Sequence, residues 1–333
     1  MFNPQENLLK AIKSKIHKKL SFIDLISSIL NIGYDAAYRR VANKTILSLN
    51  EAVILARHFN ISLNQLFNTG ESESILVTKS KKINNRAELE KYFVNTYSKL
   101  NTLLKEKQAN IYYSANDLPI FYFLNNKVLS KFKSYVWLSI FDSKFSDSKK
   151  PYKEFNQTKG LNQACEKLGL IYNKFNSKEI WNENILDKTF MQISHYLQIG
   201  LLELSDALLI CAELETVLDK IEVNARVGTK KESNNQTEFT LYNNEIVSLG
   251  NQVLIKTKNS KVALTSYSLL SYYEITNLET CNEIEDFFNK QLEISNLLSL
   301  SEEKGRSLYF NKLRKKIRQL KSQLKIENRL SII

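Results

Sequence analysis

Residues 21–67 have the sequence SFIDLISSILNIGYDAAYRRVANKTILSLNEAVILARHFNISLNQLF, and this stretch decides the predicted fold of the N-terminal part. Ser21 and Asp24 form a Ser-x-x-acid helix start, Ser48 and Glu51 form a capping box, and a second box follows at Ser62. Apolar residues recur at helical spacing after each start. With a further helix after Pro4, we expect five short helices over residues 4–67.

Turn-forming residues are scarce over the whole chain of 333 residues, with only 8 Gly and 3 Pro. A sandwich or propeller needs frequent tight turns, so helix is expected to dominate. The fold class predicted from sequence is mainly α: a five-helix N-terminal domain (1–68), a polar linker (69–85) and a larger, mostly helical domain (86–333). The β structure expected there is one small hairpin, Val253–Thr257 with Lys261–Thr265, with Phe239–Tyr242 as a further candidate strand.

Several function classes lack their motifs. The glycines never come close enough for G-x-G-x-x-G or a P-loop, and the three His and three Cys are too dispersed for a local metal motif. We therefore expect no catalysis, no cofactor and no metal. An odd number of cysteines without a signal peptide predicts a cytoplasmic protein, and no apolar run is long enough to predict a membrane span.

The net charge of +12 is concentrated at the two ends of the sequence. Residues 1–82 carry an excess of six positive charges and residues 304–333 an excess of nine, whereas the residues between them are slightly acidic. Such basic ends predict a polyanionic partner. A generally lysine-rich, soluble protein is the alternative explanation of the charge.

The helical pattern of residues 21–67 resembles the helix-turn-helix of the Cro and phage-repressor (XRE-like) class of transcriptional regulators. The resemblance rests on residues 25–33, 37–44, 48–56 and 59–67, about a fifth of the chain. It implies that the helix after Ser21 lies across the DNA backbone and that a recognition helix over about 33–42 enters the major groove. Asn31 stands where this class usually has Gly, and Gly33 where a Ser or Thr cap is common.

Under this resemblance, Ala37 and Val41 point inward and the opposite face of the recognition helix reads DNA. The predicted base contacts are Tyr34, Asp35, Tyr38 and Arg39. The predicted phosphate contacts are Ser21, Arg40, Lys44 and Thr45. The alternative is that the two tyrosines pack on neighbouring helices and the two arginines form a solvated face.

The function predicted from these residues is a sequence-specific transcriptional regulator that binds double-stranded DNA. The C-terminal domain is expected to form a homodimer or to sense an unknown ligand or protein partner, because one short recognition helix makes few base contacts. Its aromatic residues, Trp137 and Tyr113 among them, either line a ligand pocket or form the core. The alternative is a protein- or RNA-interaction scaffold with a helical N-terminal module and a basic tail, and a third is an enzyme without a sequence motif.

The last stretch of the chain is expected to form a basic helix over about residues 304–328. It carries an apolar seam of Phe310, Leu313, Ile317, Leu320 and Leu324. The seam either packs within its own domain or contributes to pairing between two copies.

Overall fold

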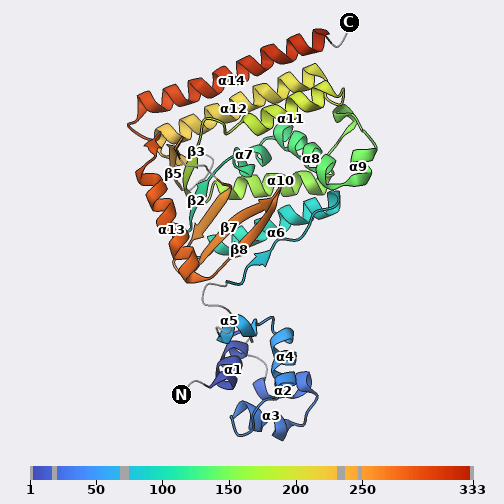
Figure 1. Cartoon of the computed structure of the whole chain (residues 1–333), viewed down its shortest axis with the longest axis vertical. Helices are drawn as coiled ribbons and strands as arrows, with labels where there is room; N and C mark the ends of the chain where they lie inside the picture. Colours follow the sequence, from blue (N-terminus) through green and yellow to red (C-terminus); the bar gives the residue numbers. More distant parts are fainter. Residues whose placement is uncertain (1–2, 17–20, 68–74, 231–236, 247–249, 331–333) are drawn as a thin grey trace. The chain divides into compact units, whose positions relative to one another are not determined.

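The computed structural model describes residues 3–16, 21–67, 75–230, 237–246 and 250–330. The chain divides into two compact units, Met1–Leu76 (unit 1) and Val77–Ile333 (unit 2) (Figure 1). No helix in the described ranges is both long and apolar enough to cross a membrane.

Unit 1 is helical, and its helices begin at the capping residues. They are α1 (Pro4–Ser14), α2 (Phe22–Leu30), α3 (Tyr34–Val41), α4 (Leu49–His58) and α5 (Leu63–Phe67). Both hydrogen bonds of the capping box at Ser48 are present. Ile12, Ile26, Ala37 and Leu55 are completely buried, one from each of the first four helices, so these helices share one small core.

Unit 2 is built on a sheet of nine described strands. They are β1 (Thr78–Lys79), β2 (Asn110–Ser114), β3 (Asn176–Trp181), β4 (Thr229–Lys230), β5 (Thr237–Asn243), β6 (Gln252–Lys256), β7 (Lys261–Ser268), β8 (Ser271–Ile275) and β9 (Asn296–Leu297). The strand order is β1-β8-β7-β6-β2-β3-β5-β4, and β9 also pairs with β5. β3 is parallel to both β2 and β5, whereas the other pairs are antiparallel.

Helices cover both faces of this sheet. They are α6 (Arg86–Leu104), α7 (Ile120–Leu124), α8 (Lys127–Phe141), α9 (Ser143–Asp147), α10 (Lys159–Tyr172), α11 (Asp187–Gln198), α12 (Leu204–Val227), α13 (Leu278–Glu293) and α14 (Glu303–Leu330), with a short 3-10 turn η1 (Tyr152–Glu154). One face packs into the main core with α6, α8, α10 and α12, and the other packs against α13. α14 runs along α12 (Figure 1).

The predicted fold class, mainly α with one small hairpin, is wrong, because unit 2 contains a large mixed sheet. The expected hairpin is present as β6 and β7, but it lies within that sheet. The candidate strand over 239–242 is present as β5. Two features hid the remaining strands. The parallel strands are joined through helices and need no tight turn, and several turns place non-glycine residues such as Gln108 and Leu270 at positive φ.

Part of the segment interpreted as a linker belongs to the sheet. β1 pairs with β8, and Ile83 is buried against the main core. The apolar pattern of residues 75–77 is too short to predict this strand.

A buried carboxylate joins the layers of unit 2. Glu179 lies on β3, completely buried on the face toward the main core. Its oxygens accept hydrogen bonds from Tyr122 of α7 (2.6 Å), Tyr172 of α10 (2.6 Å) and Trp181 of β3 (2.9 Å). Burial raises the pKa of Glu179, while Lys230 and the three donors favour its ionised form.

Lys230 of β4 supplies the buried cation of this network. Its ammonium donates to the carbonyl oxygens of Tyr172 and Phe175, both at 3.1 Å, and lies 3.8 Å from the centre of the Tyr172 ring. Burial lowers the pKa of Lys230 to about 7, and Glu179 opposes this shift. The network thus holds β3, β4, α7 and α10 together.

We predict that residues 1–76 fold alone, because unit 1 has its own core and capped helices. Circular dichroism of the purified fragment should give a helical spectrum and a cooperative melt. A random-coil spectrum without a melting transition would contradict an independent unit.

We also predict that Lys230 makes stability depend on pH. Its pKa is about 7 in the folded protein and near that of a free lysine in the unfolded chain, so the unfolded state binds more protons between these values. The free energy of unfolding should therefore rise with pH above 7, by up to about 1.4 kcal/mol per pH unit relative to Lys230→Met. Denaturant titrations at several pH values measure this slope. The exposed Lys178 serves as the control, and parallel profiles for wild type and Lys230→Met would refute the prediction.

Candidate nucleic-acid interface

The turn between α2 and α3 is closed by local hydrogen bonds. Asn31 has φ 53°, the left-handed conformation that Asn tolerates better than most residues. The Ile32 amide donates to the Ser27 carbonyl (3.1 Å), and the Ser27 hydroxyl donates to the Ile32 carbonyl (2.6 Å). These bonds fix the direction in which α3 leaves α2.

Gly33 caps α3 without needing to be glycine. Its φ of −64° and ψ of 156° suit any residue, and an added Cβ would meet nothing within 4 Å. It makes no side-chain cap, so α3 lacks the hydrogen bond that the resemblance leads one to expect.

One face of α3 is exposed along its length. Ala37 is completely buried and Val41 packs partly into the core, which leaves the other face outward. The four predicted base contacts, Tyr34, Asp35, Tyr38 and Arg39, are all exposed. The guanidinium of Arg39 makes no ion pair with any described residue, and its Nε lies 3.5 Å from the Asp35 carbonyl oxygen. These side chains are available to a partner.

The predicted phosphate contacts differ in their availability. Ser21 caps α2 and is exposed, as are Lys44 and Thr45 after α3. Lys44 lies 5.5 Å from the centre of the Tyr38 ring, beside the exposed face. Arg40, in contrast, pairs with Glu51 of α4 at 2.8 Å and donates to the Ala36 carbonyl (3.1 Å), so its side chain braces α3 against α4.

Gln5 of α1 holds the segment after α3, a role that sequence reasoning missed. Its side-chain amide donates to the carbonyls of Arg40 (2.8 Å) and Thr45 (3.0 Å), and its side-chain oxygen accepts from the Leu47 amide (2.8 Å). These contacts span about forty residues of sequence, so no local pattern could have predicted them. Gln5 thereby positions Lys44 and Thr45.

Unit 1 also exposes apolar side chains beside this face. Ile46 is 85% exposed, Leu49 78% and Ile54 45%. Exposed apolar side chains of this size can contribute to a surface that contacts another macromolecule.

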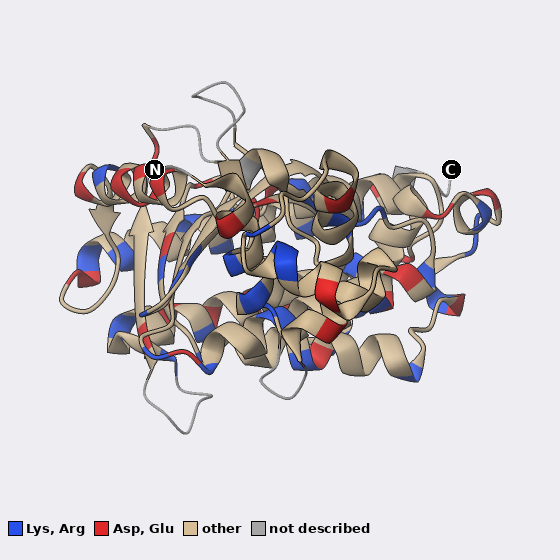
Figure 2. Cartoon of the chain, turned by 90° about the horizontal axis from the view of Figure 1, so that it is seen from below, with Lys and Arg blue, Asp and Glu red and all other residues tan. Residues whose placement is uncertain are grey.

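The basic helix α14 is partly neutralised within unit 2, where ion pairs with described acids hold four of its ten Lys and Arg residues. Lys312 pairs with Glu183, Arg314 with Asp219 and Glu222, and Lys321 with Glu215. Figure 2 shows positions of Lys and Arg interspersed with positions of Asp and Glu along the ribbon of the chain. The apolar seam of α14 is buried in the main core, so it offers no surface for pairing between copies. Because some of these cations are already paired, α14 attracts a polyanion less strongly than its number of Lys and Arg residues indicates.

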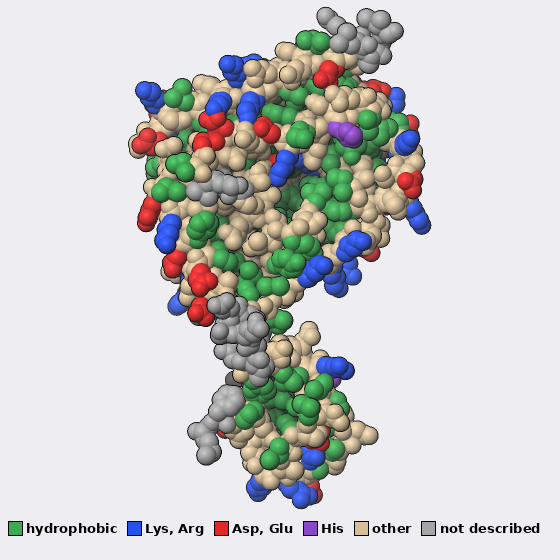
Figure 3. Space-filling model, viewed as in Figure 1, with side chains coloured by type: hydrophobic (Ala, Val, Ile, Leu, Met, Phe, Trp, Pro, Cys, Tyr) green, Lys and Arg blue, Asp and Glu red, His purple; other side chains and the backbone are tan. Residues whose placement is uncertain are grey.

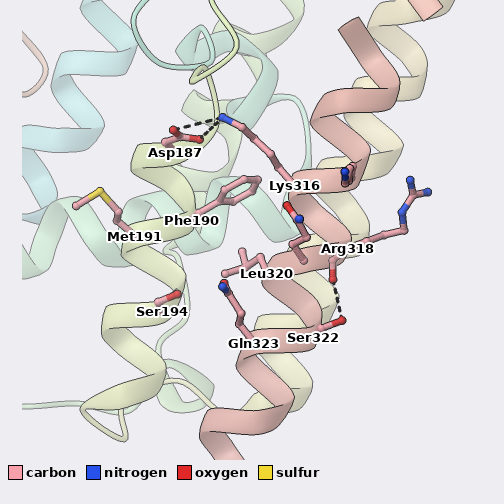
Figure 4. A pocket seen from close by; sticks show the side chains of 11 residues that line it. Asp187, Phe190, Met191, Ser194, Lys316, Arg318, Leu320, Ser322 and Gln323 are labelled. Atoms are coloured by element: carbon pink, nitrogen blue, oxygen red, sulfur yellow. Dashed lines mark hydrogen bonds and ion pairs between the residues drawn. The ribbon is translucent and has the colours of Figure 1, made fainter. Parts of the chain in front are cut away.

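An open hollow lies between α11 and α14 (Figure 4). Within it Lys316 reaches Asp187, at 3.1 Å, whereas Arg318 points away from α11. Arg318, Lys315 and Lys325 make no ion pair among the described residues. This hollow thus presents few unpaired charges and no cluster of reactive groups.

The described ranges contain neither a metal-binding cluster nor an exposed cysteine. No group of three or more His, Cys, Asp or Glu residues there could hold a metal ion. The three cysteines are buried, and burial raises the pKa of Cys165 to about 11 and of Cys211 to about 12. Both remain thiols near neutral pH.

The chain was compared with protein families, curated proteins and solved structures. No protein-family model, no curated protein and no solved structure matches this chain. The geometry of the chain itself is therefore the basis for a functional proposal.

We predict that Gly33→Ser stabilises unit 1 by about 0.5–1 kcal/mol, because serine adds a cap to α3 and reduces the entropy of the unfolded chain. Chemical denaturation of the 1–76 fragment measures the change. Gly33→Ala, which reduces the entropy of the unfolded chain but supplies no hydrogen bond to the cap, serves as the comparison. A destabilised Gly33→Ser would show that the space beside Gly33 is not open.

Proposed function

We propose that this protein binds double-stranded DNA in a sequence-specific manner and acts as a transcriptional regulator, with α3 in the major groove. One observation carries the proposal. A short helix, fixed from behind by the buried Ala37, exposes two tyrosines, an aspartate and an arginine on one face. The major groove is wide enough for one helix and presents a distinct hydrogen-bonding pattern for each base pair.

The side chains on this face have complementary base partners. Arg39 can donate two hydrogen bonds to guanine, and Asp35 can accept from the amino group of cytosine. Tyr34 and Tyr38, 52% and 45% exposed, offer hydroxyl groups and apolar contact with the methyl group of thymine.

Residues around this face suit contact with phosphate. Lys44 and Thr45 lie in the segment held by Gln5, and Ser21 lies at the start of α2. Contacts of this kind orient a protein on the duplex without reading its sequence. Arg40 acts in the proposal through its ion pair with Glu51, which keeps α3 in place.

A single reading helix supports pairing of two copies on a pseudo-palindromic site, because two-fold symmetry doubles the number of base contacts. Since the seam of α14 is buried, such pairing must use another surface of unit 2.

The second candidate function is an interaction module that contacts protein. The exposed Ile46, Leu49 and Ile54 favour it, because apolar side chains of this kind gain most from burial against another apolar surface. In this case replacing Leu49 by a polar residue would abolish partner binding and leave DNA binding unaffected.

We predict that Arg39→Ala relaxes the base preference of the protein, with a loss of about 1–3 kcal/mol on its selected site. Lys44→Ala should instead weaken binding to all duplexes about equally and lower the salt slope by about one unit. Fluorescence anisotropy with a selected and a scrambled duplex, at several salt concentrations, measures both effects.

Matched controls are Arg57→Ala and Lys13→Ala, which remove exposed cations of unit 1 outside α3 and the segment after it. Both should bind the selected duplex almost as wild type does. Unchanged affinity and preference in Arg39→Ala would overturn the assignment of α3 as the reading helix.

A further inference from the structure

Unit 2 contains two adjoining cavities on the face of the sheet that meets the main core. The first has a volume of about 510 Å³ and lies where β2 ends, beneath the β7–β8 hairpin. The second, of about 380 Å³, lies between α6 and strands β2, β6, β7 and β8. Both volumes are in the range of small-molecule sites. Figure 3 shows this side of unit 2 hollowed and lined by hydrophobic side chains, with basic side chains beside the hollow.

The first cavity, called here the head cavity, holds a buried cation. The side chain of Lys133 on α8 is only 2% exposed. Its ammonium donates to the Thr189 hydroxyl and to the Gln192 side-chain oxygen, both at 2.8 Å. Asp117 lies 3.9 Å away, beyond hydrogen-bond distance, and its other oxygen accepts from the Leu118 amide. The ammonium also lies 4.2 Å from the centre of the Phe123 ring, but no described carboxylate is within hydrogen-bond distance of it, so its charge is only partly compensated.

The charges around the head cavity favour an anion. Lys133 and Lys188 line it together with Asp117, so the cations exceed the carboxylates by one. Lys188 is exposed, which places it toward solvent, whereas Lys133 is buried. Burial lowers the pKa of Lys133, Lys188 lowers it further and Asp117 opposes the shift. A bound anion would stabilise this ammonium directly.

The second cavity, called here the tail cavity, is apolar. Its lining comes mainly from aliphatic and aromatic side chains on the sheet and α6, among them Leu100, Ile111, Val253, Val262 and Leu264. The ion pair between Lys99 and Glu274 is part of its lining. Tyr113, Ile120 and Tyr272 line both cavities, so the two spaces adjoin at these residues, and a ligand that fills both passes beside them.

We propose that unit 2 binds a small amphipathic monocarboxylate, with its carboxylate on Lys133 and its hydrocarbon chain in the tail cavity. In the head cavity the single excess positive charge matches one carboxylate. The lining of the tail cavity is mainly apolar apart from Lys79 and the pair of Lys99 with Glu274, which matches a hydrocarbon chain. The position supports this assignment, because ligands of α/β proteins commonly bind at the carboxyl ends of parallel strands, where β2 ends here. The inference does not depend on DNA binding.

Isothermal titration calorimetry of the full chain with straight-chain carboxylates, from hexanoate to dodecanoate, tests the proposal. Affinity should rise about fourfold for each methylene group until the tail cavity is full. Decan-1-ol, which has a chain of equal length but no charge, should bind at least about tenfold more weakly than decanoate. Absence of saturable binding, or equal affinities for the acid and the alcohol, would overturn the proposal.

Two variants test the two ends of the ligand separately. Lys133→Met should weaken decanoate binding at least about tenfold, and Lys127→Met, which alters an exposed lysine of the same helix, should not. Val262→Phe should reduce affinity for the longest chains and leave hexanoate binding intact, because it shortens the tail cavity.

Near-ultraviolet circular dichroism shows whether each variant keeps its packed core. Should Lys133→Met lose its fold, the exposed Lys188 provides the charge test, and Lys188→Gln should weaken decanoate severalfold without a matching effect on decanol. Unchanged decanoate affinity in the folded charge variant, or an equal effect of Val262→Phe on all chain lengths, would contradict the assignment.

Discussion

The carboxylate of Glu179 is the constraint on which the architecture of unit 2 depends. A buried carboxylate is costly unless it is hydrogen-bonded, and here the donors come from α7, α10 and β3 itself. Because Tyr122 and Tyr172 must both reach the same carboxylate on β3, the helices between β2 and β3 cannot shift along the sheet without leaving a charge unsatisfied. Lys230 joins β4 to this group through the carbonyls of Tyr172 and Phe175. α7, one of the helices that meet at Glu179, leads directly into α8, which carries Lys133 to the cavity at the end of β2.

The sequence predicts helices far better than the sheet, and the reasons lie in particular residues. The helix expected over 127–141 is α8, and the seam that begins at Phe310 lies on α14, because both have a sustained apolar stripe and clear ends. β3 was missed because Lys178 and Glu179 interrupt its apolar pattern, and only the folded structure supplies the partners that allow Glu179 to be buried. β1 and β9 contain two residues each, too few for any periodicity. A sheet joined through helices also needs few of the turn residues on which the prediction of fold class relied.

The candidate site shows a similar division. The outward face of α3 follows from helical spacing once Ala37 is placed inward, so the exposure of Tyr34, Asp35, Tyr38 and Arg39 could be predicted. The pairing of Arg40 with Glu51 and the hold of Gln5 on the segment after α3 are tertiary contacts, which spacing does not encode. Likewise, the cations of α14 look available in the sequence, but in the fold four of them, Lys312, Arg314, Lys316 and Lys321, pair with acids that are far away in the chain. The count of charged residues therefore overstates the free positive charge of α14, whereas the helical pattern predicts the helices of unit 1 well.

The central claim is that α3 reads bases, and selection of bound duplexes from a random pool by the full-length chain tests it most directly. If α3 reads the major groove, successive rounds should enrich one short motif, and the enrichment should persist at salt concentrations that release non-specific complexes. A pool that remains random in sequence while the protein still binds duplexes and heparin alike would contradict the claim, because it would mean that unit 1 contacts only phosphate.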